Sequence, residues 1–421
     1  MHAAFRLRQR GGSTLAVVML LMLVMTLTAA YLQRSLVFEQ KTSLHQYRAT
    51  QAAEAAEAGL EWGLAMLNAS RVDERCMPQA AGVRLQERAL ILADVHEGGF
   101  VPAFDATKSG APACRRDTTG WQCGCPLNGR STPPEAPDNA LHPGFRVEFS
   151  GVAGDDGKSL PSVVRLVAHG CAHVGAAFCA DSAAAEPGHA TVSVQAALVP
   201  ALAAVPPAVL TAGGDVDFGG DPVGVHNADP GSALLVHAGG SFIAPSARLS
   251  PPAGTPVASA LLEHDQLLAA HSVEQLMSTY LGMPLATFSH LPGVATLHCE
   301  AGCASALHSG LAAGVRMFYV TGDLSIDDDD IGTMAEPVAL VVNGNARLGP
   351  GVRITGFLFA RSLQWQAGSG GNAWLHGAAV VAGPALIGGA PDLTRDAEAL
   401  NLLHVLTGTY TRVPGSWKDT L

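Results

Sequence analysis

The chain is poor in aromatic and charged residues, and basic residues are the minority among the charged ones. Of 421 residues, 5% are aromatic and 14% are charged, and 25 Lys and Arg stand against 36 Asp and Glu, so the formal net charge is −11. Proteins that bind nucleic acid need basic residues to neutralise phosphates and aromatic side chains to stack on bases. The soluble part has no basic cluster beyond its first turn. We therefore expect no nucleic-acid partner.

Signatures of the common enzyme classes are also missing. The chain has no GxSxG, HExxH or Walker loop, and its 16 histidines are scattered. The pair His264-Asp265 has only a distant serine to complete a catalytic set, and a chain of this length yields such pairs by chance. We expect no enzyme activity and no cofactor.

Only one apolar run is long enough to cross a membrane without proline or glycine. It covers residues 13–32, and about 20 residues at 1.5 Å each match a bilayer core of roughly 30 Å. Three arginines precede it within residues 6–10, and Arg34 follows it. Because basic flanks stay in the cytoplasm, we expect the chain after Arg34 to be exported.

The helical pattern continues beyond this run. Small and apolar residues recur at three- and four-residue spacing over residues 44–67, and three glutamates within 54–61 fall on another face. One continuous helix over residues 13–68 would be roughly 80 Å long, which suits a filament core better than a globular domain. A cleaved secretory signal is disfavoured, because the pattern continues through Ala29 and Ala30.

The start of the chain resembles the class III signal of type IV pilins. A short basic leader, residues 1–12, ends in Gly12 and is followed by Ser13-Thr14-Leu15 and the apolar helix. Residues 51–60, QAAEAAEAGL, are similar to a segment of PilX-type minor pilins. The resemblance is specific over residues 6–68 and looser over the C-terminal half. It implies cleavage by prepilin peptidase after Gly12, with cleavage after Gly11 as the alternative.

On this alignment the fifth mature residue is Val17, where most pilins carry glutamate. In a pilin filament that carboxylate would neutralise the N-terminal amine of the neighbouring subunit, because an unpaired charge in an apolar core is costly. Val17 packs but neutralises nothing, which implies a place at the start or tip of a filament. A plain anchor in which Val17 faces lipid is the alternative. The residues expected to pack in assembly are Val17, Leu20, Leu23 and Leu27.

The resemblance therefore implies a structural protein, a minor pilin of the type IV pilus. It would insert in the bacterial inner membrane with its C-terminal part in the periplasm, join other minor pilins and the major pilin to prime assembly, and lie at the pilus tip, with an adhesin as a possible further partner. One alternative is a K-type minor pseudopilin of type II secretion, which also lacks the glutamate. Another is a membrane-tethered β-helix protein that acts on polysaccharide, which would need carboxylates and aromatics along one groove.

Eight cysteines in an exported chain indicate disulfides. Spacing favours a bond between Cys171 and Cys179 and another between Cys299 and Cys303. The other four lie in a proline-rich region and would pair among themselves; they are Cys76, Cys114, Cys123 and Cys125. Zinc is the alternative, although neither candidate set has the spacing of a standard knuckle. The first set is Cys114, Cys123 and Cys125, and the second is His298, Cys299, Cys303 and His308.

For residues 69–205 we predict a disulfide-containing pilin-like region. It starts with a weak helical stretch over 83–94 and a loop rich in proline, glycine and cysteine. Three strands follow, the first two with alternating apolar residues, over 145–151, 163–171 and 190–199, with a turn at 154–157. We expect a three- or four-stranded antiparallel sheet that packs on the outer half of the long helix. The fold class is therefore α+β.

For residues 206–421 we predict a β-rich, solenoid-like domain. Runs of three to five residues alternate with glycine and proline turns, which is typical of stacked β-rungs that bury Val, Leu and Ile against one another. An irregular β-sandwich is the alternative. We expect a helical insertion over 260–282 and a second helix over 393–406 that caps the last rung; the alternative is that the two helices bind a partner.

Four consecutive carboxylates form the one candidate metal site outside the cysteines. They are Asp327, Asp328, Asp329 and Asp330, with Asp323 nearby, and carboxylate oxygens are calcium ligands. They lack the spacing and the glycine of an EF-hand loop, and a solvated turn is the simpler interpretation.

Overall fold

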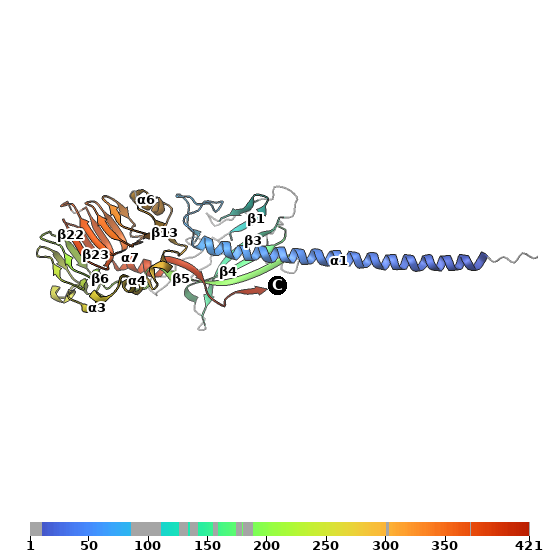
Figure 1. Ribbon diagram of the computed structural model, residues 1–421, viewed down its shortest axis with the longest axis horizontal. Coiled ribbons are helices and arrows are strands. Elements are labelled where there is room, and N and C mark those ends of the chain that lie inside the picture. The colour runs from blue at the N-terminus through green and yellow to red at the C-terminus, as the bar shows by residue number, and fades with distance from the viewer. Residues whose placement is uncertain are drawn as a thin grey trace, which may run out of the picture.

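The computed structural model describes residues 11–85, 111–125, 134, 142–154, 159–173, 179, 188–299, 303–370 and 372–420. It contains one long helix, an antiparallel sheet on the second half of that helix, and a parallel β-solenoid beyond the helix end (Figure 1). This arrangement confirms the predicted α+β class. Three sequence expectations fall on residues outside the described ranges: the leader up to residue 10, the helical stretch over 86–94, and the turn at 155–157.

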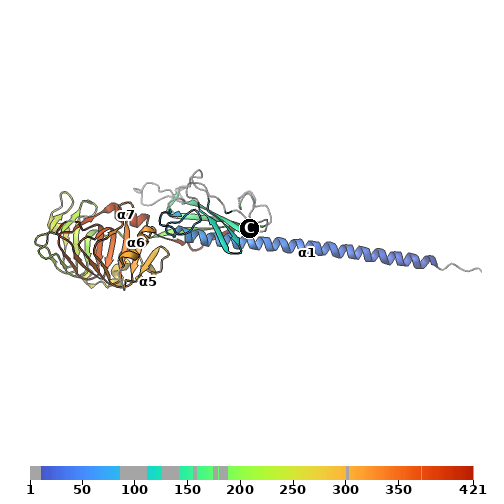
Figure 2. The same ribbon diagram turned by 90° about the horizontal axis from the view of Figure 1, so that it is seen from above.

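Helix α1 extends without interruption from Gly11 to Leu67, 57 residues or about 86 Å. The segment is rich in alanine, leucine and methionine, which favour helix, and it contains no proline. Its first part projects from the rest of the molecule as a rod (Figures 1 and 2). The predicted single helix is therefore confirmed.

The antiparallel sheet has seven strands, more than the sequence predicted. They are β1 (Ala113–Asp117), β2 (Gly120–Gly124), β3 (Gly144–Ala153), β4 (Ser159–Cys171), β5 (His189–Pro200), β24 (Gly408–Arg412) and β25 (Lys418–Thr420). Their order is β2-β1-β3-β4-β5-β24, and β25 also pairs with β5. The assignment of all of 206–421 to the solenoid is therefore wrong at its end, because the last two strands return to the first sheet. The solenoid is an insertion between β5 and β24.

Small residues bring α1 very close to this sheet. Gly170 on β4 faces the helix so closely that a Cβ there would lie 2.1 Å from the carbonyl oxygen of Ala52. A Cβ on Gly59 would lie 3.0 Å from the ring of Phe145, and one on Gly63 would lie 3.0 Å from Val147. These glycines and the buried alanines of the helix are what allow β3 and β4 to cover it.

In the solenoid every strand pairing is parallel, which rules out the sandwich alternative. The first group of strands is β6 (Ala208–Ala212), β7 (Val216–Asp217), β8 (Gly224–Asn227), β9 (Leu234–Ala238), β10 (Phe242–Ile243), β11 (Arg248–Ser250) and β12 (Leu261–Leu262). The second group is β13 (Val294–Leu297), β14 (Met317–Val320), β15 (Leu324–Ile326), β16 (Asp330–Ile331), β17 (Val338–Val342), β18 (Asn345–Leu348), β19 (Arg353–Ala360), β20 (Ser362–Gln366), β21 (Trp374–Val381), β22 (Ala385–Gly388) and β23 (Asp392–Arg395).

The coils do not stack in chain order. Strands β6–β12 wind from the middle of the solenoid to the end far from α1, and strands β13–β23 then wind from the antiparallel sheet back to the middle (Figure 1). There β21, β22 and β23 pair with β6, β7 and β8 in a seam that joins the two halves. One register position of this seam pairs Ala379 with Leu210.

One broad face of the solenoid is covered by helices. On β14, β17, β19 and β21 alternate side chains point inward and outward, and both sets are buried. The outward set packs against α3 (Gln266–Ala270), α4 (Val273–Leu281), α5 (Leu285–Phe288) and α7 (Ala397–Val405). The six-stranded sheet β10-β7-β22-β20-β18-β15 instead has an exposed outer side.

Two helix predictions need correction. The expected insertion over 260–282 is broken: a 3-10 helix (Val257–Ala260) and strand β12 precede α3, and Ser272 starts α4 with a capping box. Helix α7 does not cap an end of the solenoid. It lies on the face of β19 and β21, because its apolar side carries Leu400 and Leu403, which are buried against these strands. The junction end of the solenoid core is filled instead by α6 (Ala304–Ala312), whose Leu307 is buried in it.

Candidate assembly surface on the N-terminal helix

The first two thirds of α1 form an exposed rod that is apolar over residues 14–32. Every residue from 14 to 50 is exposed, a length of about 55 Å, whereas burial under the sheet begins with Ala52. The expected packing residues all lie on this rod: Val17 is 59% exposed, Leu20 64%, Leu23 59% and Leu27 62%. Exposed apolar surface of this extent marks a contact with a membrane or with partner subunits.

This rod is long and apolar enough to cross a membrane, and it is the one helix in the described part of the chain with that property. Thr26 and Thr28 place no unsatisfied hydroxyl in the apolar stretch. The Thr26 hydroxyl donates to the carbonyl of Leu23, and the Thr28 hydroxyl donates to the carbonyls of Val24 and Met25, each at 2.9 Å. The first acidic residue of the chain is Glu39.

The predicted processing position lies at the start of the helix. Gly12 and Ser13 belong to the first turn of α1, which begins at Gly11. The basic leader precedes the described residues. Cleavage itself remains a prediction from sequence.

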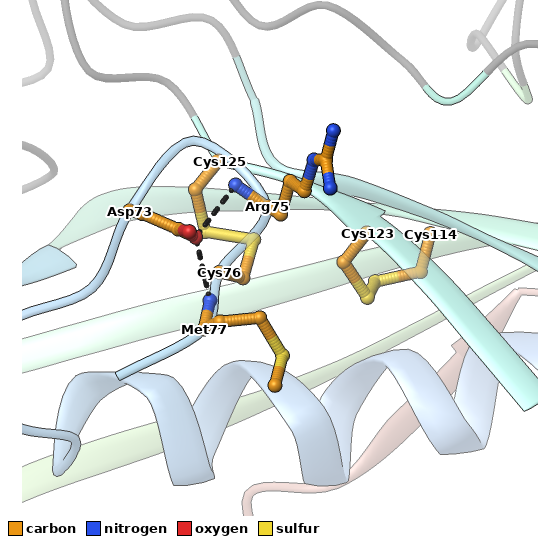
Figure 3. Close-up of a disulfide and its surroundings, with 7 residues drawn as sticks. All are labelled: Asp73, Arg75, Cys76, Met77, Cys114, Cys123 and Cys125. Carbon is orange, nitrogen blue, oxygen red and sulfur yellow. Dashed lines mark hydrogen bonds between the residues drawn. A yellow bond between two sulfur atoms is a disulfide. The ribbon is translucent and has the colours of Figure 1, made fainter. Parts of the chain in front are cut away.

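The eight cysteines are joined in four bonds: Cys76–Cys125, Cys114–Cys123, Cys171–Cys179 and Cys299–Cys303. The Cys114–Cys123 bond links directly opposite residues of β1 and β2. The Cys76–Cys125 bond fastens the loop after α1 to the end of β2, and Asp73 holds the same loop by accepting hydrogen bonds from the backbone N–H of Arg75 and Met77 (Figure 3). No thiol remains as a ligand for either zinc alternative.

The four consecutive aspartates have different partners. Asp330 forms an ion pair with Arg353, and a carboxylate oxygen of Asp328 lies 3.7 Å from the guanidinium of the same arginine. Asp329 is bonded to His308 of α6. Among the described residues, no three His, Cys, Asp or Glu side chains are arranged to hold a metal ion.

The pair His264-Asp265 is part of the fold. Asp265 is the N-cap of α3 and accepts hydrogen bonds from the backbone N–H of Leu267 and Leu268. Its other oxygen lies 2.8 Å from His237, not from a serine. The hydrogen bond from His237 is the main reason why the pKa of Asp265 lies below its usual range.

Sequence reasoning missed a charged cluster at the junction between the sheet and the solenoid. Glu336 forms ion pairs with Arg71, at 2.9 Å, and with the buried Arg316. Burial acts to raise the pKa of Glu336, but the charges of Arg316 and Arg71 outweigh it and hold that pKa below its usual range. The cluster joins residues 265 positions apart, so no local pattern signals it.

The N-terminal helix is similar to a known family. Residues 11–61 match the PilX N-terminal family model, so the exposed rod and the start of the buried part of α1 are similar to a PilX N-terminal segment. No curated protein matches the chain by sequence. Among solved structures, the competence-associated pilin ComZ from Thermus thermophilus is similar at 10% identity over 89% of this chain and 97% of that one, with a TM-score of 0.24. A score of this size does not establish a common fold.

Proposed function

We propose that this chain is a minor pilin of the type IV pilus that prepilin peptidase cleaves between Gly12 and Ser13. After cleavage it would join other minor pilins in the inner membrane, prime pilus assembly and remain at the filament tip. The observation that carries the proposal is the PilX N-terminal match of residues 11–61, which falls on a helix whose first half is exposed and apolar.

The charge pattern of the helix supports an initiating role. Cleavage would leave a positively charged amine on Ser13, and the nearest carboxylate in the chain is Glu39, more than five helical turns away. A subunit without a carboxylate at Val17 offers nothing to neutralise the amine of another subunit in the apolar filament core. It therefore suits a position where no such docking is required.

The direction of the solenoid supports a terminal position. The solenoid prolongs the axis of α1 beyond the antiparallel sheet, and two perpendicular views agree on this (Figures 1 and 2). In a filament whose subunits stack along their long helices, a subunit placed further along that axis would collide with the solenoid. At the tip this space is free.

N-terminal sequencing of the protein from membranes tests the processing step. We expect Ser13 as the first residue in cells with prepilin peptidase and Met1 in cells without it. Gly12→Leu is expected to block cleavage, with Gly11→Leu as the matched control that remains cleaved. Met1 retained in both cell types would refute the pilin assignment, whereas a block only in Gly11→Leu would move the cleavage to Gly11.

Immunogold labelling of sheared pili tests the tip position. Labelling confined to filament ends is expected, and labelling along the shaft would contradict it. If the protein is absent from pili and its deletion abolishes secretion but not piliation, the chain is a pseudopilin of type II secretion instead.

A further inference from the structure

The open face of the solenoid carries a hollow that assembly does not explain. It has a volume of about 780 Å³ and extends across strands β15, β18, β20, β22 and β7. These strands pair in parallel, so equivalent side chains form straight rows across the coils. At about 4.8 Å per strand, five strands give a groove roughly 19 Å long.

The hollow results from glycine in one of these rows. The first outward row is Ser325, Arg347, Gln364, Leu386 and Asp217. Two residues further along the chain stand Asp327, Gly349, Gln366, Gly388 and Gly219, of which Gln366 and Gly388 end their strands and the other three lie just beyond the strand ends; all five line the hollow. Three of these five positions have no side chain, so the floor of the groove lies at the level of the backbone.

The groove presents hydrogen-bonding groups that the protein itself does not use. Gln364 and Gln366 are exposed, and their amides make no hydrogen bond within the described part of the chain. Two carboxylates are held in place at one end: Asp217 accepts from the N–H of Gly219, and Asp221 accepts from the N–H of Gly389, each at 2.7 Å. Each of these two carboxylates keeps a second oxygen that can accept hydrogen bonds.

We propose that this groove binds a neutral polysaccharide chain. A sugar hydroxyl both donates and accepts, and a row of amides and carboxylates matches it on both counts. The groove crosses several coils, so a linear polymer along it meets the same kind of side chain once per strand. The proposal concerns the displayed solenoid, and it holds whether or not the processing and tip assignments are correct.

Two other classes of ligand fit less well. An extended peptide that adds to a sheet needs free backbone groups. In the described chain β7, β22, β20 and β18 already pair on both sides, and β15 is the one edge strand under this groove, so a peptide could add only at that end and would run along β15 instead of across the coils. Anionic polymers would meet Asp217, Asp221 and Asp327 with only Arg347 to attract them, and the summed charge repels them. The aromatic rings of Phe218 and Trp365 are buried beneath the groove, so binding rests on hydrogen bonds and is expected to be weak at each site.

The full chain in a zwitterionic detergent without a sugar headgroup allows a direct test. Saturation-transfer NMR and calorimetry would measure binding of cellohexaose, maltohexaose and chitohexaose, with an oligogalacturonate as the anionic probe and an extended polar peptide as the third class. We expect at least one neutral hexasaccharide to bind at millimolar concentration. Neither the oligogalacturonate nor the peptide is expected to bind more tightly.

Two variants assign the binding to the groove. Gly388→Leu fills the floor, and the atoms nearest its Cβ belong to side chains, the amide of Gln366 at 2.9 Å and the carboxylate of Asp221 at 3.2 Å. We expect Gly388→Leu to abolish binding. The double variant Gln364→Ala/Gln366→Ala should weaken binding about tenfold, through the loss of one or two hydrogen bonds. The matched controls are Gly322→Leu, whose Cβ meets nothing within 4 Å, and the exposed Gln266→Ala.

Three results would overturn the proposal. The first is that no neutral hexasaccharide binds to the native chain. The second is that Gly388→Leu leaves binding unchanged while its circular dichroism spectrum and melting temperature equal those of the native chain. The third is that the oligogalacturonate or the peptide binds in the groove more tightly than any neutral sugar.

Discussion

Asn68, the residue that follows helix α1, is bonded on both sides of its amide to the backbone of Tyr410. Its Oδ1 accepts from the N–H of Tyr410 at 2.7 Å, and its Nδ2 donates to the carbonyl of Tyr410 at 2.9 Å and to that of Leu64 at 3.0 Å. One side chain thus joins the end of helix α1 to β24, the edge strand that the chain adds to the antiparallel sheet after the solenoid insertion. These bonds between residues 342 positions apart fasten β24 to helix α1.

Replacement of Asn68 by alanine is expected to weaken the attachment of β24 to helix α1. Asn68→Ala removes both bonds to Tyr410 and leaves two backbone groups without partners, which costs about 1–3 kcal/mol of the free energy of unfolding. Chemical denaturation of the full chain in detergent measures the loss. The exposed Asn372→Ala serves as control and is expected to change stability by less than about 0.5 kcal/mol. Equal effects of the two variants would show that the bonds to Tyr410 contribute nothing.

Gly170 is expected to tolerate no side chain. A Cβ there would meet the backbone of α1, the oxygen of Ala52 at 2.1 Å and the nitrogen of Ala56 at 2.4 Å, so Gly170→Ala must push the helix off the sheet. We expect destabilisation of about 2–3 kcal/mol. Thermal unfolding followed by near-ultraviolet circular dichroism measures it, with Gly322→Ala as control. A melting temperature unchanged in Gly170→Ala would show that helix and sheet pack less closely than described.

The junction is expected to weaken in acid. The pKa of Glu336 is lower in the folded chain than in the unfolded one, so its ion pairs with Arg71 and Arg316 stabilise the fold fully above the unfolded carboxyl pKa of about 4.3. This contribution is lost as the pH falls through the lowered folded pKa. Hydrogen exchange of the 68–72 and 313–317 segments between pH 7 and pH 3 measures it.

Glu336→Gln provides the comparison. At neutral pH it leaves the buried Arg316 without its carboxylate, and we expect a loss of roughly 1–2 kcal/mol, because Glu336 itself is partly exposed. Once the pH falls below the lowered folded pKa of Glu336, native and variant chains should converge, since the carboxyl of the native chain is then protonated. A constant difference over the whole pH range would exclude the titration of Glu336 as the cause.

Arg395 is expected to hold the seam of the solenoid. It lies on β23 in the last coil, and it donates to the carbonyl of Pro206 at 3.1 Å and forms an ion pair with Asp229, both of which belong to the first coils. Its side chain is 5% exposed, so Arg395→Ala leaves Asp229 unpaired and should cost about 2–4 kcal/mol. Hydrogen exchange should show loss of protection over 208–238 first. The exposed Arg361→Ala is the control, and a uniform loss over all coils would contradict a seam.

The difference between what sequence predicted well and poorly has a physical basis. Helix α1 was predicted to within two residues at each end, because helix formers, the lack of proline and the spacing of apolar residues act within a few turns. Strands β3, β4 and β5 carry alternating residues and were also recognised. For β1 and β2 the sequence pattern predicts a loop, because the pairing of these strands depends on the Cys114–Cys123 bond and on β3 and not on their own pattern.

The groove and the junction escaped prediction for a related reason. Nothing local distinguishes the glycines at 349, 388 and 219 from those that form ordinary turns, and only the stacking of the coils brings all three to the lining of one hollow. Glu336 and Arg71 likewise lie far apart in sequence. Sites assembled across coils become visible only when the partner of each strand is known.

The sequence by itself determined the N-terminal rod, its run of apolar side chains, the absence of a carboxylate at position 17 and the β-rich character of the second half. Tertiary structure alone decided that β6 packs on β21, that the last strands return to the first sheet, and which face of the solenoid stays open. The periodicity of apolar residues indicates which side of a helix or strand is buried. It does not indicate which coil packs against which, because many coils have a similar pattern. The choice among them is made by the total surface that the assembled coils bury together.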